Sequence, residues 1–584
     1  MMTLLVWICA AATLLGTTFA TPAPFRLVLL HTNDMHARFE QTDQNSSKCQ
    51  PRQGECYGGF ARVAHEVRQA RAKARSGQSP PVLFLNAGDT FQGTVWYTVH
   101  KWRVAAAFIN ILQPDAISLG NHEFDDGVAG LVPFLNNVTC PVLAANVNTS
   151  LEPSLVVNKS VVLDVNGVQV GVVGYLTPDT KNISQTGEVE ITDEVEALTK
   201  EMQRLKSMGV NILIALGHSG YDVDLRIARE VPDVDVVIGG HTNTFLYSGS
   251  QPDSDVPDGL YPTVVTQASG RKVPVVQAYA YTKYLGQLTM EFDQDGESKH
   301  YVGNPILLNS KIPQDPDVLD ELERWRKGIT EMTKTTVGST KVFLEGSTKQ
   351  CRVVECNLGN LITDAMVLFH MQNYRGPGWT DAPIAIQHGG GIRNSIDSPN
   401  GQVTMEDLLG VLPFGNMIYL ATMNGSQVME MLEWSVYHHD PAGIINSGGF
   451  LQYSGLKVTY NMSNPLGHRV TSAMARCGQC RVPAYHSVHP SGRYNVLVPQ
   501  FLANGGDGYA VLKHANTTKY DYTDFHVVVN YFQLKSPVYP AVEGRIIFNP
   551  SLQDVVEKSK GLASRLSLTP LSVLVCVLCT LVYK

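Results

Sequence analysis

Polar residues follow five apolar runs of the sequence, and most of them are Asp, Asn or His. The runs occupy residues 27–30, 82–85, 116–119, 212–216 and 234–238. Each has the length and composition of a buried strand. Alternating strand and helix patterns favour parallel strands, and open α/β sheets carry their active sites at the carboxyl ends of such strands. If the five strands are parallel neighbours, their polar ends converge on one patch.

These residue types suit a centre with two divalent metal ions. Two ions about 3.5–4 Å apart can clamp the attacking and leaving oxygens of a phosphoryl displacement and supply a hydroxide near neutral pH. A ligand that bridges both ions needs two oxygens and a negative charge, and Asp89 is the candidate. Imidazole suits zinc, whereas carboxylate and amide oxygens suit manganese or magnesium. A single His after a strand is more often an exposed loop residue, but five such segments argue against that alternative.

The motifs of the calcineurin-type metallophosphoesterases resemble five segments of this chain: Asp34-x-His36, Gly88-Asp89, Gly120-Asn121-His122-Glu123, Gly217-His218 and Gly240-His241. Their spacing is similar to that in the 5'-nucleotidases. The second domain of that family resembles two further segments, Gly389-Gly-Gly-Ile-Arg393 and Asn504-Gly-Gly-Asp507-Gly-Tyr509. The resemblance therefore covers nearly the whole mature chain.

The resemblance implies an α/β fold with two domains, and 584 residues are more than one ordinary domain needs. An αββα-sandwich metallophosphoesterase domain would span residues 25–311, and a second α/β domain, which binds the substrate, would span residues 338–548. Residues 312–337 have a charged amphipathic pattern that predicts a linker helix, with a plain surface helix as the alternative. Two other amphipathic segments, 59–75 and 191–208, predict helices that cover the sheet.

The resemblance also implies the metal ligands and the metal. The expected ligands are Asp34, His36, Asp89, Asn121, His218 and His241, with Asn243 as an optional addition. Zinc is the expected metal, with manganese, magnesium or cobalt as alternatives.

His122 and Asp125 form a candidate catalytic dyad. A His beside the metals can protonate the leaving alkoxide, and a carboxylate three residues later can fix its tautomer and raise its pKa. In the family this pair has that role. The alternative is that Asp125 only caps a helix.

Two arginines and an aspartate of the second half are candidate substrate ligands. Arg352 and Arg393 can fork onto phosphate oxygens, which Lys cannot do. Asp507 can accept hydrogen bonds from ribose hydroxyls.

Two aromatic side chains and one imidazole are the candidates for the base site. Phe414 and Phe501 can stack on both faces of a purine. By composition alone they would be core residues, and the family motifs favour the binding role. His388 stands where the vertebrate enzymes have an Asn that hydrogen-bonds the base, so we expect looser base selectivity here.

The expected activity is extracellular hydrolysis of nucleoside 5'-monophosphates, such as AMP to adenosine and phosphate. An apyrase or UDP-sugar hydrolase shares the fold and every metal ligand and is the enzyme alternative. A non-catalytic receptor or adhesion ectodomain is a remote one. The net charge of −8 and the absence of a basic run argue against a nucleic-acid polymer as partner.

Residues 1–20 are apolar and end in small residues, which predicts a secretory signal peptide, with a retained anchor as the alternative. Eight Asn-x-Ser/Thr sequons support secretion and glycosylation. They begin at Asn45, Asn137, Asn148, Asn158, Asn182, Asn424, Asn461 and Asn516.

Seven of the ten cysteines lie outside the two terminal apolar segments. Close pairs in an oxidising compartment predict local disulfides. The pairs are Cys49/Cys56, Cys351/Cys356 and Cys477/Cys480. A zinc half-site or redox motif is the alternative for the last pair, and Cys140 is expected to be a buried free thiol.

The end of the chain resembles a glycolipid-anchor signal. Small residues at Ser559 and Gly561 precede a short spacer and an apolar run that ends near Lys584. Cleavage there would remove residues 560–584 and leave the protein at the cell surface on a GPI anchor, with Ser551 and Ser564 as alternative attachment points. A retained transmembrane helix is the other alternative. The family resemblance also implies a homodimer.

Overall fold

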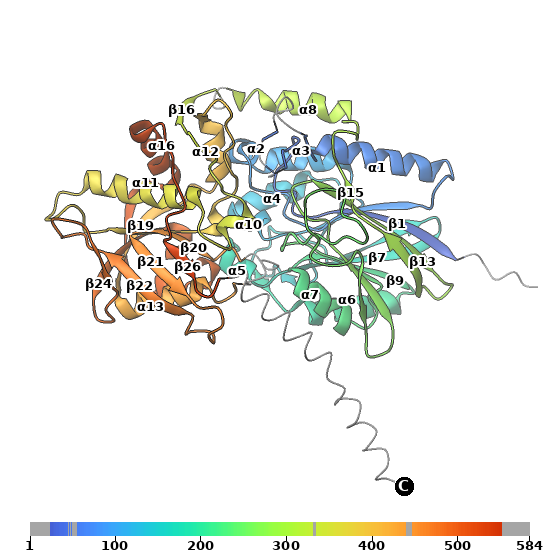
Figure 1. Cartoon of the computed structure of the whole chain (residues 1–584). Helices are drawn as coiled ribbons and strands as arrows, with labels where there is room; N and C mark the ends of the chain where they lie inside the picture. The colour runs from blue at the N-terminus through green and yellow to red at the C-terminus, as the bar shows by residue number, and fades with distance from the viewer. Residues whose placement is uncertain are drawn as a thin grey trace, which may run out of the picture.

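The computed structural model describes residues 24–44, 46, 48–49, 55–330, 334–439 and 447–551 (Figure 1). The predicted signal peptide, the GPI signal with Ser559 and the sequon at Asn45 lie outside these residues. Within them, no helix has the length and apolar character needed to cross a membrane.

The first domain contains two sheets. In the first sheet β1 (Phe25–Thr32), β2 (Val82–Asn86), β3 (Ala116–Ser118) and β4 (Val142–Leu143) run parallel as consecutive neighbours. The antiparallel strand β13 (Tyr284–Phe292) pairs with the outer side of β1, and β14 (Ser298–Gly303) and β15 (Ile306–Leu307) pair with β13.

The second sheet has the strand order β11-β12-β10-β9-β7-β6. Its central strands β7 (Val168–Leu176), β9 (Ile212–His218), β10 (Val236–Ile238) and β12 (Lys272–Val276) are parallel. The edges are β11 (Thr263–Thr266) and β6 (Ser160–Val165). The expectation that the five predicted strands are neighbours is therefore wrong: three belong to the first sheet and two to the second.

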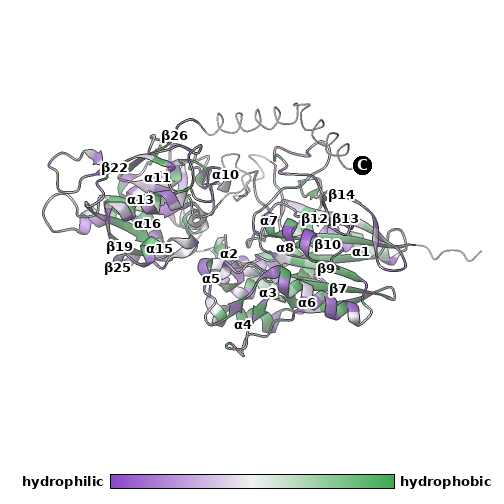
Figure 2. Cartoon of the chain, turned by 90° about the horizontal axis from the view of Figure 1, so that it is seen from below, coloured by the Kyte–Doolittle hydropathy of each residue, from purple (hydrophilic) through white to green (hydrophobic). Residues whose placement is uncertain are grey.

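Helices cover the outer faces of the two sheets, which pack against each other (Figure 1). Helices α1 (Phe60–Arg75), α3 (Trp102–Leu112) and α4 (Gly127–Asn137) cover the first sheet, and α6 (Glu194–Ser207) and α7 (Tyr221–Glu230) cover the second. Apolar strands fill the middle of the domain (Figure 2). The predicted αββα sandwich is confirmed.

The two predicted sheet-covering helices are present with small differences at their starts. Helix α1 begins at Phe60, one residue after the predicted start. Helix α6 begins at Glu194 because residues 190–191 pair as strand β8 (Glu190–Ile191) with β5 (Val147–Asn148). The Asp193 carboxylate caps α6 by accepting from the Glu196 N–H.

Helix α8 (Pro316–Arg326) lies in the predicted linker and packs on α1 and α3. The Asp315 carboxylate caps it, and Pro316 occupies its first turn, which proline tolerates. Figure 1 shows α8 running along the top of the first domain toward the second.

The second domain also contains two larger sheets. The five-stranded sheet has the order β20 (Leu451–Ser454), β17 (Ile384–His388), β24 (Arg493–Pro499), β19 (Met417–Asn424) and β25 (Asn516–Thr523). The four-stranded sheet consists of β23 (Tyr485–Ser487), β22 (Val470–Arg476), β21 (Leu456–Tyr460) and β26 (Ile546–Phe548), and a small ladder joins β16 (Thr336–Ser339) to β18 (Gln402–Thr404). The main helices are α11 (Asn357–Asn373), α12 (Met405–Val411), α13 (Gly425–Ser435) and α16 (Asp524–Lys535).

Short helical elements lie in the connections between the longer helices and strands. They are α2 (Val95–His100), η1 (His122–Phe124), α5 (Thr180–Ile183), α10 (Thr348–Cys351), η2 (Gly389–Gly391), α14 (Gln500–Ala503), η3 (Gly506–Gly508) and α15 (Ala510–Lys513).

The three predicted disulfides are confirmed. Cys49–Cys56, Cys351–Cys356 and Cys477–Cys480 are bonded. Cys140 is free, as predicted, but it is only partly buried.

Candidate active site

The polar segments that follow β1, β2, β3, β9 and β10 meet at one end of the two sheets. Glycines allow this close approach. A Cβ on Gly120 would lie 2.2 Å from the Asp89 Oδ1, and one on Gly240 would lie 2.8 Å from the His218 Nδ1 and 3.0 Å from the Asp34 Oδ2. The convergence predicted from the sequence is therefore present, although two sheets supply it.

Asp89 lies at the centre of this cluster. It belongs to two groups whose ligand atoms all lie within 4.8 Å of one another, one with His36 and His122 and one with His218 and His241. The Asp89 Oδ2 is 2.9 Å from the His218 Nε2 and 3.8 Å from the His36 Nε2. A carboxylate shared by two groups is what a bridging ligand requires.

Asp34 completes the inner part of the cluster. Its Oδ1 is 3.7 Å from the His218 Nε2 and 3.8 Å from the His36 Nε2, and this buried oxygen has no hydrogen-bond partner in the described part of the chain. These oxygen and nitrogen atoms could bind the same metal ion, because two ligand atoms that each form a bond of about 2 Å to one ion lie at most about 4 Å apart.

The second nitrogens of two histidines are bound to backbone carbonyls. The His218 Nδ1 lies 2.7 Å from the Ala87 carbonyl, and the His36 Nδ1 lies 3.3 Å from the Phe91 carbonyl. Metal-binding histidines commonly have such outer partners, which fix the ring orientation. The Nε2 atoms are left facing the cluster.

Asn121, His241 and Asn243 are the remaining expected ligands. The Asn121 Oδ1 is 2.9 Å from the His241 Nδ1, and the His241 N–H donates to the Asp34 Oδ2 at 2.9 Å. The Asn243 amide donates to the Tyr281 hydroxyl at 3.4 Å, while its buried Oδ1 has no partner among the described residues. These contacts bring six of the seven expected ligands together, and Asn243 lies two residues after His241 in the same loop.

The charges of the cluster call for cations. Burial, with a contribution from Asp89, raises the pKa of Asp34 to about 6. Burial disfavours a charged His218, yet the carboxylates of Asp89 and Asp34 raise its pKa to about 10. Burial and the nearby His218 lower the pKa of His241 to about 3, so His241 is neutral and able to bind a metal. The donor set fits two divalent ions.

Glu123 holds the central loops in place, a role that we did not predict. Its carboxylate accepts hydrogen bonds from the N–H groups of Asp89, Thr90, Phe91 and Gly120 at 2.7–3.1 Å. Glu123 is adjacent to His122 in its motif, and that position was the only signal in the sequence.

His122 and Asp125 are in contact. The His122 Nδ1 lies 2.6 Å from the Asp125 Oδ2, and the Ser184 hydroxyl donates to the other oxygen of Asp125. Burial opposes charge on His122, but Asp125 and Asp89 raise its pKa. Asp125 follows the last residue of η1, but its carboxylate binds His122 and Ser184 and caps no described helix, and the residue before α4 is Asp126, so the capping alternative is wrong.

Arg393 and Phe414 extend from the second domain to the first. The Arg393 Nη2 is 3.4 Å from the His36 Nδ1, and the Phe414 ring is stacked on His122 with ring centroids 6.0 Å apart. The Arg393 guanidinium carbon also lies 5.8 Å from the Phe414 ring centre. A phosphate bound to the metals would therefore be within reach of this arginine.

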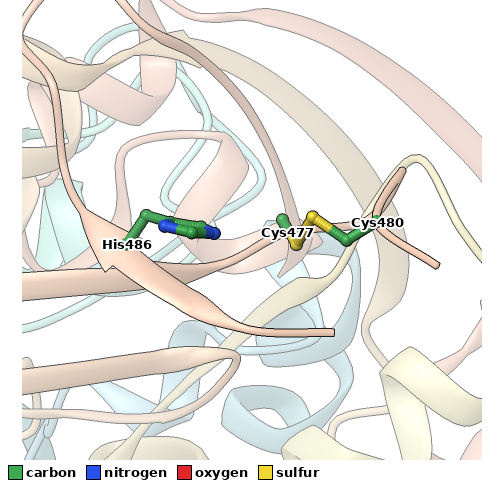
Figure 3. A group of neighbouring side chains, drawn as sticks. All are labelled: Cys477, Cys480 and His486. Carbon is green, nitrogen blue, oxygen red and sulfur yellow. A yellow bond between two sulfur atoms is a disulfide. The ribbon is translucent and has the colours of Figure 1, made fainter. Parts of the chain in front are cut away.

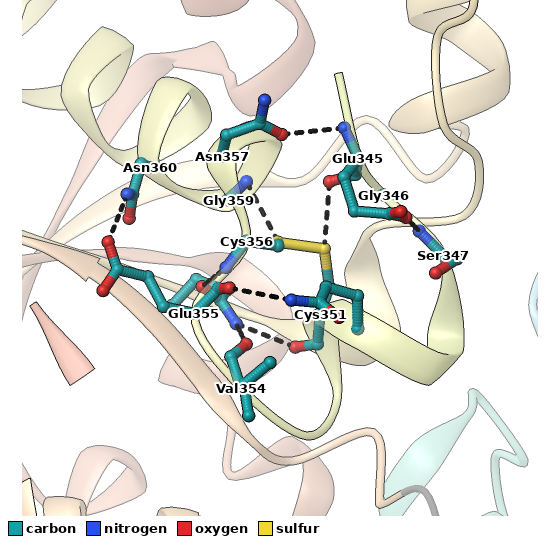
Figure 4. Close-up of a disulfide and its surroundings, with 12 residues drawn as sticks. Glu345, Gly346, Ser347, Cys351, Val354, Glu355, Cys356, Asn357, Gly359 and Asn360 are labelled. Carbon is teal, nitrogen blue, oxygen red and sulfur yellow. Dashed lines mark hydrogen bonds between the residues drawn. A yellow bond between two sulfur atoms is a disulfide. The ribbon is translucent and has the colours of Figure 1, made fainter. Parts of the chain in front are cut away.

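Arg352 follows Cys351 in a small loop that the Cys351–Cys356 disulfide closes. Figure 4 shows this disulfide and its surroundings. The buried Gln452 amide donates to the carbonyls of Cys351 and Val354 and accepts from the Cys356 N–H. This glutamine, which we did not predict, ties the Arg352 loop to β20.

His388 lies against Phe501 in the predicted base site. The two rings are stacked with centroids 4.8 Å apart, and the buried His388 Nδ1 has no partner among the described residues. Burial, Arg352 and Arg393 lower the pKa of His388 to about 3, so its ring is neutral. Phe414 and Phe501 are both half-buried and not core residues.

Asp507 lies in the same domain beside the glycines that precede β20. A Cβ on Gly448 would lie 3.6 Å from its Oδ2, which is buried and without a partner in the described chain. Burial raises the pKa of Asp507 to about 6.

The Cys477, Cys480 and His486 group is not a metal centre. Figure 3 shows that the two sulfur atoms are bonded to each other, beside the His486 ring. Disulfide sulfurs are not thiolate ligands. The zinc half-site alternative is therefore excluded for this oxidised form.

Comparisons with known proteins agree with this architecture. Residues 27–245 match the calcineurin-like phosphoesterase family, and residues 336–514 match the 5'-nucleotidase C-terminal domain family. The chain is 45% identical to "Protein 5NUC" of Lutzomyia longipalpis over 94% of this chain and 97% of that protein. It is 44% identical to the 5'-nucleotidase of Bos taurus over 90% and 91%, respectively. The crystal structure of a 5'-nucleotidase precursor from Thermus thermophilus superposes with a TM-score of 0.81 at 35% identity, covering 90% of this chain and 99% of that one. This chain therefore belongs to the 5'-nucleotidase family of metal-dependent phosphoester hydrolases.

Proposed function

We propose that the protein hydrolyses nucleoside 5'-monophosphates, AMP foremost, to a nucleoside and phosphate. The observation that carries the proposal is the position of Asp89, which belongs to two groups of possible metal ligands. Arg393 and Phe414 of the second domain contact two histidines of these groups, His36 and His122. Curated relatives named 5'-nucleotidase, similar over nine-tenths of the chain, support the monophosphate substrate.

Asp89 and the six other expected ligands would hold two divalent ions, with zinc as our proposal because three of the ligands are imidazoles. When bound, the ions supply a nucleophilic water near neutral pH and neutralise phosphate charge. Asp34 and Asp89 provide the negative charge that retains them.

The other residues bind the substrate and move a proton. Arg352 and Arg393 hold the phosphate oxygens, and the phosphorus is thereby placed in line with its leaving ribose oxygen. His122 donates a proton from its Nε2 to that oxygen, while Asp125 accepts from the Nδ1 and keeps the ring oriented.

The base and ribose would bind in the second domain. Phe414 and Phe501 supply aromatic faces for a purine, His388 supplies a neutral ring nitrogen, and Asp507 accepts from the ribose hydroxyls. Phosphate release from AMP, ADP, ATP and UDP-glucose, each with and without chelator, tests the assignment. Preference for ATP would indicate an apyrase, and no activity on any of them would end the enzyme interpretation.

We also propose that the protein is a secreted glycoprotein held at the cell surface by a GPI anchor. Six of the sequon asparagines are exposed, as glycosylation requires: Asn137, Asn148, Asn158, Asn182, Asn424 and Asn516. Asn461 is half-exposed. A homodimer would follow from the family resemblance.

A GPI-specific phospholipase tests the anchor, because it should release the enzyme from intact cells. A protein that stays on the membrane and still carries Lys584 would be anchored by its own apolar segment instead.

A further inference from the structure

A cavity of about 130 Å³ lies between the two domains, beside the active site. Its walls come from both domains and carry mainly cationic and hydroxyl groups. Arg38, Ser254 and Tyr279 line it from the first domain, and Thr348, Lys349 and Arg393 line it from the second.

Two buried guanidinium groups face this cavity, and neither forms an ion pair with a carboxylate in the described part of the chain. Arg38 is 2% exposed and Arg393 is 8% exposed. Arg38 donates to the carbonyls of His36, Gly93 and Arg393 and to the Asn394 Oδ1, but its buried Nε has no partner among the described residues. Buried charges normally have a counter-charge.

The carboxylate in the cavity wall cannot serve as that counter-charge, because lysines already neutralise it. The Asp255 Oδ2 is 2.5 Å from the Lys283 Nζ, and its Oδ1 is 3.3 Å from the Lys349 Nζ. Lys283 also pairs with Asp253 at 2.8 Å. The side chains that line the cavity therefore carry three cations and one carboxylate, an excess of two positive charges, and the Glu345 carboxylate lies behind this lining, where it accepts hydrogen bonds from Ser347 and Ser395.

We propose that this cavity binds a small tetrahedral oxyanion such as inorganic phosphate. A doubly charged oxyanion would balance the two surplus charges. The Lys349 ammonium and the hydroxyls of Thr348 and Ser254 are the additional donors, and charge-assisted hydrogen bonds of this kind are the strong ones. Arg393 forms the wall between this site and the metal centre, since its Nη2 points to His36.

Both domains contribute residues to the site, so the anion binds only to the conformation in which the two domains are in contact. An anion held there while substrate occupies the metal centre would stabilise the contact and slow product exchange. Phosphate should therefore inhibit with an uncompetitive component in addition to competition at the metals. This kinetic consequence rests on the proposed nucleotidase activity, whereas the binding site itself does not.

Crystals of the metal-loaded enzyme soaked in selenate test the site directly. We expect an anomalous selenium peak in the cavity, separate from any peak at the metal centre. Lys349→Gln and Thr348→Val should each weaken it. Lys349 is an exposed residue outside the catalytic set, and Lys341→Gln, at another exposed lysine of the same domain, is the matched control.

Inhibition of AMP hydrolysis by phosphate and by sulfate tests the consequence. Lys349→Gln should raise the inhibition constant of the uncompetitive component by about tenfold. The competitive component and the kcat/KM without added anion should stay unchanged.

Three results would overturn the proposal: a selenium peak at the metal centre only, a cavity peak that Lys349→Gln leaves unchanged, or a cavity peak with purely competitive inhibition, which would mean binding at crystal concentration only. Failure of the nucleotidase assignment would look different, because the unmodified enzyme would not hydrolyse AMP while the cavity peak would persist.

Discussion

The Arg38 guanidinium donates a 2.6 Å hydrogen bond to the Asn394 Oδ1 across the boundary between the two domains. On its own side Arg38 is bound to the His36 and Gly93 carbonyls, and Asn394 directly follows Arg393. One side chain therefore fixes the distance between a metal-ligand loop and a phosphate-binding arginine. Tyr281 stacks on the same guanidinium, 4.6 Å from its carbon atom.

Asn394→Ala removes the acceptor of this bond without touching a metal ligand. We expect kcat/KM for AMP to fall by about tenfold, because a charge-assisted hydrogen bond contributes about 1.5–3 kcal/mol and part of it is replaced by water. Metal content should stay unchanged. Asn373→Ala, at an exposed asparagine of α11, is the control, and a normal kcat/KM in Asn394→Ala would show that the bond does not position Arg393.

Asp89→Ala tests the bridging ligand. The variant should lose bound metal and essentially all activity while it is still glycosylated and reaches the cell surface, since the loop is held mainly by Glu123. Metal analysis of the purified protein and phosphate release from AMP measure both effects. If most of the metal and of the rate remain, Asp89 is not the bridge.

Asp125→Asn tests the dyad through pH. Burial lowers the pKa of His122, and the carboxylates of Asp125 and Asp89 raise it above the ordinary value. Removal of the Asp125 charge lowers that pKa, so His122 loses its proton at a lower pH. The alkaline limb of the kcat profile should therefore move to lower pH, and kcat should fall by about 10² or more.

The neighbouring residue supplies the control for this change. Asp126 is bound to Tyr97 and Lys101 instead of to His122. Asp126→Asn should leave the position of the alkaline limb unchanged, and an equal shift in both variants would mean that the limb does not report His122.

His388→Asn tests base selectivity. The neutral His388 ring offers one donor and one acceptor on opposite sides, whereas Asn offers both together. The unmodified enzyme should hydrolyse AMP, IMP and GMP with efficiencies within about tenfold, or ~1.4 kcal/mol, and the Asn variant should prefer AMP more strongly. Rejection of IMP and GMP by the unmodified enzyme a hundredfold or more would contradict this role.

Local patterns predicted that these polar side chains converge, because each candidate ligand lies at the end of an apolar strand or a few residues after it. Asp34, Asp89 and His218 lie where strand ends place them. The division of the strands into two sheets could not be predicted, since an apolar run such as β9 does not specify its neighbour.

Contacts between distant segments were also missed. Arg38 and Asn394 are 356 residues apart, and neither has a local motif. Gln452 contacts the Arg352 loop only because β20 pairs with β17. The stacking of His388 on Phe501 likewise depends on tertiary packing, although each residue was a candidate for the base site.

The ligand loops have an unusual backbone. Asp34, His36, Asp89, His241 and Asn243 all have φ between 46° and 78°, a region that non-glycine residues rarely occupy. Each such residue destabilises the fold by about 1 kcal/mol or more. Replacement of one of them by glycine would relieve the backbone at that position. A descendant of this protein with no use for metal could therefore become more stable each time glycine replaced one of these ligands. The presence of all five residues in this chain, at a cost in stability, is expected of a protein that uses them to bind metal.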